Sequence, residues 1–123
     1  MARARILIVD DSETARGLLQ MVVQAQDFDV ETAADGAEAL AAIQRHAPDL
    51  IVTDGVMPGI DGPTLFRRLK ADPETRQIPV IALTSGDPGD WQATPDGPGP
   101  DGILEKSADV QPLLALLDQL LGA

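Results

Sequence analysis

Residues 5–16 read RILIVDDSETAR, an aliphatic run that ends in two adjacent aspartates. Two similar runs lie further along the chain, Leu50 to Thr53 and Pro79 to Leu83. None of the three alternates apolar with polar residues, which is typical of strands that are buried on both faces. The sequence therefore predicts a parallel sheet that contains these three runs.

Two further runs have the features of edge strands. Phe28 to Thr32 alternates apolar and polar residues, as expected where one side contacts water, and Gly102 to Glu105 is short. The segments between the five runs have helical periodicity, with Ser12, Asp35 and Asp61 as candidate N-caps. This alternation of strands and helices predicts an α/β domain with helices on both faces of the sheet.

One segment, Gly86 to Gly102, departs from the alternation and reads GDPGDWQATPDGPGPDG. A parallel crossover needs a dozen or more residues and is usually a helix. Proline and glycine are so frequent here that a helix is disfavoured. We therefore expect a loop, with at most one short turn around residues 90–94. Trp91 is expected to pin this loop to the body of the domain, with an interface anchor as the alternative.

Composition limits the classes of function. The 123 residues suit a single domain, 1–123, and the absence of cysteine excludes disulfide scaffolds and thiolate chemistry. With 20 acidic against 9 basic residues, the formal net charge of −11 argues against nucleic acid or an anionic membrane as the main partner. No apolar stretch is long enough to span a bilayer, and the start of the chain lacks the features of a signal peptide. A cytoplasmic location is expected.

Polar residues follow the ends of the predicted strands: Asp10, Asp11, Asp54, Thr84 and Lys106. Ligands of open parallel sheets bind beyond the carboxyl ends of the strands, so these side chains are expected to converge. Three close carboxylates repel one another unless a cation intervenes, and an all-oxygen cluster suits Mg²⁺. An ammonium and a hydroxyl suit a phosphoryl group. The pattern predicts a phosphoryl-transfer site in which a carboxylate is the nucleophile.

The chain resembles the receiver domain of two-component response regulators, the CheY-like family. Four motifs in order carry the resemblance: ILIVDDSETAR, PDLIVTDGVMPGIDG, IPVIALTS and ILEKS. It covers essentially the whole chain apart from Gly86 to Gly102. The resemblance implies a flavodoxin-like, doubly wound sheet of five parallel strands in the order 2-1-3-4-5. In this chain the fourth helix would be shortened or replaced by the proline- and glycine-rich loop.

The resemblance also implies a role for each site residue. Asp54 would be the phosphoacceptor, with Thr84 and Lys106 contacting the phosphoryl oxygens. Mg²⁺ would be held by Asp10, Asp11 and Asp54 and by the backbone carbonyl of Val56. The phosphoryl group would come from the phosphohistidine of a kinase or phosphotransfer protein, and phosphorylation would change contacts with a downstream protein. Such a domain is a signalling phosphoacceptor and not an enzyme with an external substrate.

Two positions depart from the family pattern. Ile103 stands where family members usually carry Tyr or Phe, and Ser107 stands where proline usually follows the lysine. The lost aromatic at Ile103 and the expected loss of the fourth helix leave an alternative open, a receiver-fold interaction module whose output no longer depends on phosphorylation. A flavodoxin-type carrier is disfavoured because Asp10 and Asp11 would repel a flavin phosphate. A phosphatase of the haloacid dehalogenase type is disfavoured because its two aspartates would be separated by one residue.

Overall fold

The computed structural model describes residues 3–84, 99–106 and 109–121. Its centre is a five-stranded parallel sheet in the order β2-β1-β3-β4-β5, which confirms the predicted flavodoxin-like topology. Each predicted strand is present, and its bounds agree with the prediction to within one residue. The strands are β1 (Arg5–Val9), β2 (Asp29–Ala33), β3 (Leu50–Asp54), β4 (Val80–Thr84) and β5 (Gly102–Glu105).

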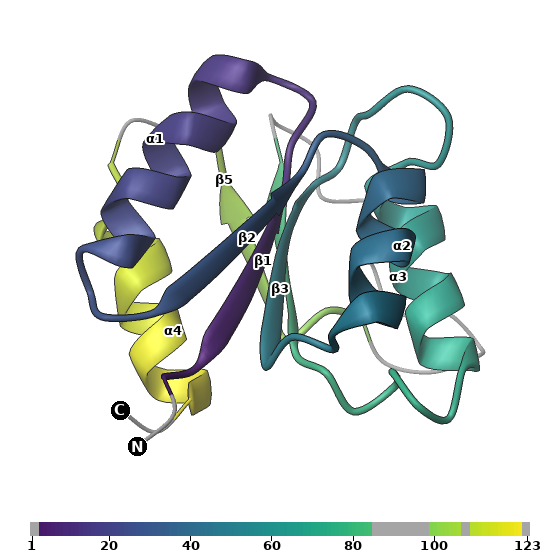
Figure 1. The fold of residues 1–123 in the computed structure, drawn as a ribbon. Coiled ribbons are helices and arrows are strands. Elements are labelled where there is room, and N and C mark those ends of the chain that lie inside the picture. The colour runs from purple at the N-terminus through teal and green to yellow at the C-terminus, as the bar shows by residue number, and fades with distance from the viewer. Residues whose placement is uncertain (1–2, 85–98, 107–108, 122–123) are drawn as a thin grey trace.

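Within the described residues, four helices cover the sheet: α1 (Glu13–Gln24), α2 (Gly36–Arg45), α3 (Gly62–Ala71) and α4 (Gln111–Leu121). Helices α1 and α4 lie on one face and α2 and α3 on the other (Figure 1). The three predicted N-caps are confirmed, because Ser12, Asp35 and Asp61 each accept a hydrogen bond from a backbone N–H three residues later. These caps satisfy N–H groups that a helix cannot pair internally.

The buried strands contribute side chains to two hydrophobic cores, one on each face of the sheet. Alternate side chains of a strand point to opposite faces of the sheet, so neighbours in β1 enter different cores. Leu7 and Val9 pack with residues of α2 and α3, whereas Ile6 and Ile8 pack with residues of α1 and α4. Burial on both faces explains why β1, β3 and β4 read as continuous aliphatic runs.

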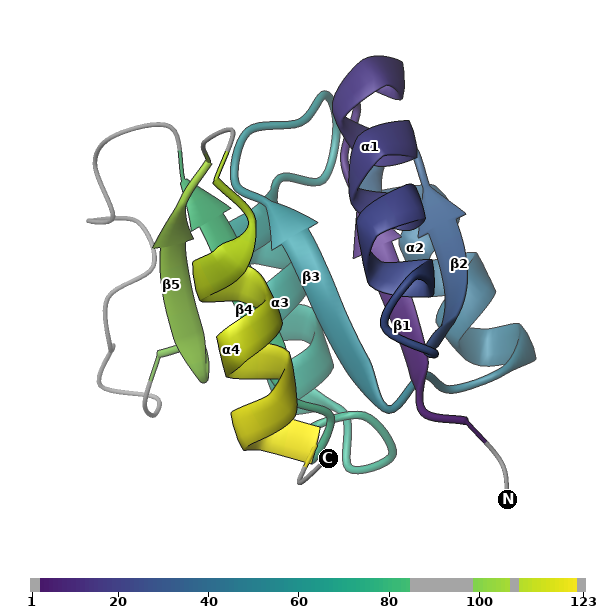
Figure 2. The same cartoon turned by 90° about the vertical axis from the view of Figure 1, so that its left-hand side faces the viewer.

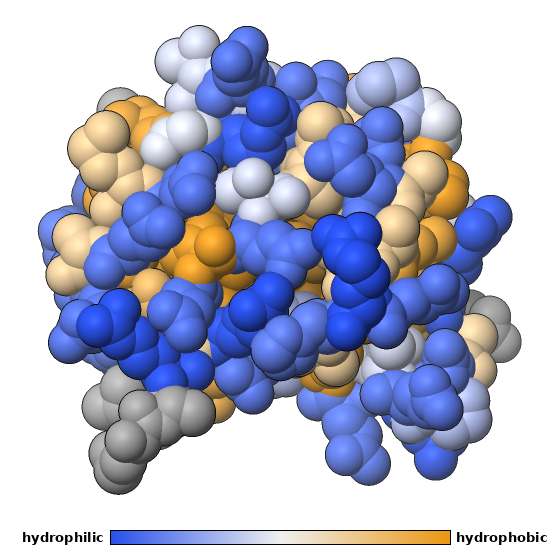
Figure 3. Space-filling view, in the orientation of Figure 1, coloured by the Kyte–Doolittle hydropathy of each residue, from blue (hydrophilic) through white to orange (hydrophobic). Residues whose placement is uncertain are grey.

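The edge strands lie at β2 and β5, as the sequence predicts. On β2, the carboxylate of Glu31 pairs with Arg5 and with Arg45, linking β2 to β1 and α2. The face shown in Figure 3 is mostly hydrophilic, with apolar side chains in separate patches. Charged side chains on an edge strand disfavour pairing with another chain. The opposite edge, β5, is visible beside α4 in Figure 2.

Some predictions fall outside the described residues. Most of the expected loop from Gly86 to Gly102, with Trp91, belongs to the range 85–98, and Ser107 belongs to 107–108. Asp101, just before β5, pairs with Val80 at the start of β4. Its backbone N–H donates to the Val80 carbonyl and its carboxylate accepts from the Val80 N–H, both at 2.9 Å. None of the helices in the described ranges is long and apolar enough to cross a membrane.

Candidate functional site

The carboxyl ends of three strands bring the predicted site residues together. Asp10 follows β1, Asp54 ends β3, and Lys106 follows β5. Asp54 continues the alternation of Leu50 and Val52, which face the core beneath α1 and α4. The sheet therefore aims the Asp54 carboxylate to the same side as the start of α1, where Asp10 lies.

Three carboxylates gather at this edge. One oxygen from each of Asp10, Asp11 and Asp54 lies within 4.8 Å of the others. Their exposure differs, because Asp10 is fully buried, Asp54 is 7 % exposed and Asp11 is exposed. A buried carboxylate is unfavourable without compensating charge or hydrogen bonds, so this arrangement calls for a cation.

Lys106 supplies positive charge at the cluster. Its ammonium nitrogen lies 2.9 Å from Oδ2 of Asp10 and 3.1 Å from Oδ2 of Asp54. Partial burial alone would lower the pKa of Lys106, but the close carboxylates of Asp10 and Asp54 outweigh it and raise the pKa above its ordinary value. The lysine therefore stays charged throughout the physiological range.

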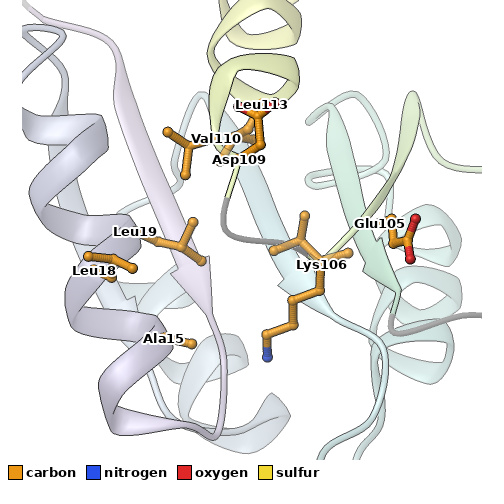
Figure 4. Close-up of a pocket in the computed structure, with 9 residues that line it drawn as sticks. Ala15, Leu18, Leu19, Glu105, Lys106, Asp109, Val110 and Leu113 are labelled. Carbon is orange, nitrogen blue, oxygen red and sulfur yellow. The ribbon is translucent and has the colours of Figure 1, made fainter.

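A backbone hydrogen bond holds Lys106 in place, and its side chain lines a neighbouring pocket. The Lys106 N–H donates to the Thr84 carbonyl at 2.6 Å, which ties the end of β5 to β4. Figure 4 shows its side chain extending beside a pocket between α1 and α4. That pocket has a volume of about 70 Å³ and is lined largely by apolar side chains, among them Ala15, Leu18, Leu19, Val110 and Leu113.

The two oxygens of Asp10 have different surroundings. Oδ1 accepts a hydrogen bond from the Ser12 N–H at 2.9 Å. Oδ2 is buried and lies 2.9 Å from the Lys106 ammonium, and the described residues supply no other partner to its remaining lone pair. A buried carboxylate oxygen that still has lone pairs to donate, beside two further carboxylates, fits the oxygen ligands that Mg²⁺ prefers.

Arg16 is a residue of this site that the sequence reasoning missed. It lies near the start of α1 and is half-buried, and its Nη1 donates to the Asp10 carbonyl oxygen at 2.9 Å. A positive charge near a helix N-terminus opposes the helix dipole, so its presence calls for an explanation. That unfavourable position is the signal in the sequence that could have identified it.

The loop after β3 is held in place at several points. Met57 is buried in the core, while Val56 is 76 % exposed. The Gly62 N–H donates to the Gly55 carbonyl at 3.0 Å, and Gly59 has a φ of 75°, which glycine adopts readily. This anchoring fixes the path of the chain past Asp54. The role of the Val56 carbonyl as a metal ligand stays a prediction.

Thr84 lies beside the cluster without joining it. It is buried at the end of β4 and continues the alternation of Val80 and Ala82, which face the core beneath α2 and α3. Within the described part of the chain, its hydroxyl makes no hydrogen bond to Asp10, Asp54 or Lys106. Its predicted contact with a phosphoryl oxygen stays a prediction.

Comparison with known proteins agrees with this geometry. The sequence model of the family described as "Response regulator receiver domain" matches residues 6–118. The chain belongs to the response regulator receiver family. This result confirms the resemblance seen in the sequence, and it disfavours the flavodoxin-type and phosphatase alternatives.

Relatives of this receiver domain include both longer proteins and solved structures. It is 50 % identical over 84 residues to "Response regulator PleD" of Caulobacter vibrioides, covering 68 % of this chain and 18 % of that protein. A putative response regulator from Chloroflexus aurantiacus has a TM-score of 0.88 at 34 % identity, with 98 % of this chain and 99 % of that chain covered. The receiver domain of a sensor histidine kinase from Pseudomonas aeruginosa, solved with magnesium in its active-site cleft, has a TM-score of 0.83 at 26 % identity, covering 99 % and 100 %.

Proposed function

We propose that this receiver domain accepts a phosphoryl group on Asp54 in a reaction that depends on Mg²⁺. The observation that carries the proposal is the position of the Asp54 carboxylate, 3.1 Å from the Lys106 ammonium and within the cluster formed with Asp10 and Asp11. A nucleophilic carboxylate beside a fixed cation suits attack on an anionic phosphoryl group.

The proposed donor is a phosphohistidine on a kinase or phosphotransfer protein. An oxygen of Asp54 forms a bond to phosphorus as the N–P bond of the donor breaks, and the imidazole nitrogen keeps the electron pair and takes up a proton. The Lys106 ammonium, already at the Asp54 carboxylate, stabilises the negative charge on the transferred group. Thr84 is proposed to donate its hydroxyl to another phosphoryl oxygen.

Asp10, Asp11, Asp54 and the Val56 carbonyl would hold the Mg²⁺. When bound, Mg²⁺ would screen the carboxylates from one another and draw the phosphoryl oxygens toward Asp54. The buried Oδ2 of Asp10, whose partner among the described residues is the Lys106 ammonium, supports this proposal because it keeps lone pairs for a metal ion. So does the Pseudomonas aeruginosa neighbour, whose magnesium is coordinated in its active-site cleft.

The proposed output is a change in protein–protein contact. Phosphorylation gives Lys106 a new partner on Asp54, and Lys106 is tied through its backbone to Thr84. A shift at this point reaches β4 and β5 together. The domain would act in the cytoplasm with a kinase or phosphotransfer protein on one side and a downstream protein target on the other. It would catalyse only its own phosphorylation and slow dephosphorylation.

The test is the mass of the protein after incubation with phosphoramidate, a small donor that carries an N–P bond. With Mg²⁺ we expect one added phosphoryl group, and with EDTA in place of Mg²⁺ we expect none. Asp54→Asn removes the nucleophile and abolishes the gain. Asp118→Asn, at an exposed position on α4, is the matched control and keeps it. A gain that survives Asp54→Asn would overturn the assignment, and no gain in the natural chain would favour the phosphorylation-independent interaction module.

A further inference from the structure

We infer that Arg16 is a positioning residue for the magnesium site, acting through the backbone of Asp10. This inference rests on the proposed function, because it assigns a role toward the Mg²⁺ that the acidic cluster would hold. The contact that carries it runs from Nη1 of Arg16 to the Asp10 carbonyl oxygen, at 2.9 Å. Arg16 touches no carboxylate of the cluster and would not contact the reacting atoms.

Besides its ion pair with Lys106, Asp10 is held by three hydrogen bonds from different directions. Its backbone N–H donates to the Ala33 carbonyl at 3.1 Å, its Oδ1 accepts from the Ser12 N–H at 2.9 Å, and its carbonyl oxygen accepts from Arg16. The first contact anchors the residue to β2 and the second fixes the carboxylate. The Arg16 contact fixes the plane of the peptide that joins Asp10 to Asp11.

Asp11 depends on that peptide more than Asp10 does. Its side chain is exposed and, among the described residues, its carboxylate makes no hydrogen bond. The direction of its side chain is therefore set by the backbone on its two sides: the Asp11–Ser12 peptide, whose N–H donates to Oδ1 of Asp10, and the Asp10–Asp11 peptide, which Arg16 holds. Fixing the Asp10–Asp11 peptide keeps the Asp11 carboxylate within 4.8 Å of the other two, which a metal with strict geometry requires.

The positive charge of Arg16 and its hydrogen bond to Asp10 have opposite effects on magnesium affinity. A cation near the cluster repels Mg²⁺, so loss of the charge alone would strengthen magnesium binding. Loss of the positioning contact would weaken it, and groups that orient metal ligands typically contribute about 10- to 100-fold in metal affinity. The repulsion is reduced by salt, whereas a hydrogen bond to a carbonyl is not. The two effects therefore differ in sign and in salt dependence.

The experiment measures Mg²⁺ affinity by calorimetry at two salt concentrations for the natural chain and three variants. Arg16→Met removes both donor and charge, and we expect magnesium binding about tenfold weaker at both salt concentrations. Arg16→Lys keeps the positive charge and a hydrogen-bond donor, so its magnesium affinity should lie between those of Arg16→Met and the natural chain. The matched control is Arg68→Met, which removes one positive charge from an exposed position in the last turn of α3 and should change affinity by less than about twofold.

A kinetic measurement separates positioning from chemistry. With phosphoramidate as donor, Arg16→Met should need about tenfold more Mg²⁺ for half-maximal phosphorylation and should reach nearly the natural rate at saturating Mg²⁺. Thermal melting in EDTA shows whether each variant folds. If Arg16→Met does not fold, the magnesium affinity of Arg16→Lys is compared with that of the natural chain instead. Unchanged or tighter magnesium binding in Arg16→Met would overturn the inference. If the natural chain itself binds no Mg²⁺, the proposed function fails first.

Discussion

The ammonium of Lys106 lies 2.9 Å from Oδ2 of Asp10, a carboxylate that is fully buried. The two residues directly follow β1 and β5, strands that are separated in the sheet by β3 and β4. Besides its proposed contact with a phosphoryl oxygen, Lys106 therefore has a structural role. Without a metal ion it balances the charge of a residue that water does not reach, which makes it a determinant of stability.

Replacement of Lys106 should destabilise the domain most when no metal is present. Lys106→Met keeps most of the apolar stem but leaves the charge of Asp10 uncompensated, and breaking such a pair costs about 3 kcal/mol. Saturating Mg²⁺ should restore more than half of the loss, because the ion replaces the missing positive charge. Urea unfolding in EDTA and in Mg²⁺ measures the difference. Equal losses under both conditions would show that Lys106 does not balance the acidic cluster.

Neutralising Asp11 should separate stability from magnesium binding. Asp11→Asn removes one of three mutually repelling carboxylates, so the protein in EDTA should gain a few tenths of a kcal/mol of unfolding free energy. The same change removes a proposed ligand, so Mg²⁺ should stabilise the variant less than it stabilises the natural chain. Melting curves with and without Mg²⁺ test both statements. A variant that is less stable in EDTA and keeps its full response to Mg²⁺ would contradict the cluster model.

The sequence predicted the parts of the site that strand ends determine. Parallel strands place their carboxyl ends at one edge, so the residues at the ends of β1, β3 and β5 were expected to lie close together once the strands were recognised. Asp10, Asp54 and Lys106 meet there. The helix caps at Ser12, Asp35 and Asp61 were equally local, because an N-cap depends on the next three residues.

What the sequence did not predict depends on tertiary geometry. Arg16 acts through a backbone carbonyl, and its reach depends on the phase of α1 and on a side-chain rotamer. Asp49 shows the same limit: its carboxylate accepts from the Arg5 N–H at 2.7 Å and its N–H donates to the Arg5 carbonyl at 2.8 Å. That pairing sets the register between β3 and β1. A carboxylate that binds the backbone of a residue 44 positions away leaves no local motif, unlike the N-caps, which bind a backbone N–H three residues later.

Two glycines should respond to alanine in opposite ways. A Cβ on Gly36, at the start of α2, would lie 2.7 Å from the Ile60 carbonyl oxygen in the loop after β3. Gly36→Ala should therefore cost about 1–3 kcal/mol and loosen the loop that follows Asp54. Gly17 in α1 has open space around it, so Gly17→Ala should stabilise the domain by about 0.5–1 kcal/mol through helix propensity. Chemical unfolding of both variants measures these changes. Changes in unfolding free energy of the same sign in the two variants would contradict the prediction.

The N-cap of α3 should give a defined dependence on pH. Hydrogen bonds from the side chain and backbone of Thr64 hold the pKa of Asp61 below its ordinary value. A carboxyl group with a depressed pKa in the folded state stabilises the fold above its unfolded pKa, about 3.9, and this contribution is lost as the pH falls through the lower folded pKa. Asp61→Ala should therefore cost about 1 kcal/mol at pH 7 and less below about pH 4.

Asp61→Asn isolates the charge from the cap. Asparagine caps helices about as well as aspartate but does not titrate, so the change removes what the negative charge contributes, its favourable interactions with the start of α3 and with Arg67. At pH 7 the natural chain should be more stable than Asp61→Asn by about 0.5 kcal/mol, and the two should converge as the pH falls below about 4. Unfolding free energies measured from pH 3 to pH 7 give the comparison. A difference that stays constant across this range would show that the Asp61 charge does not stabilise the helix.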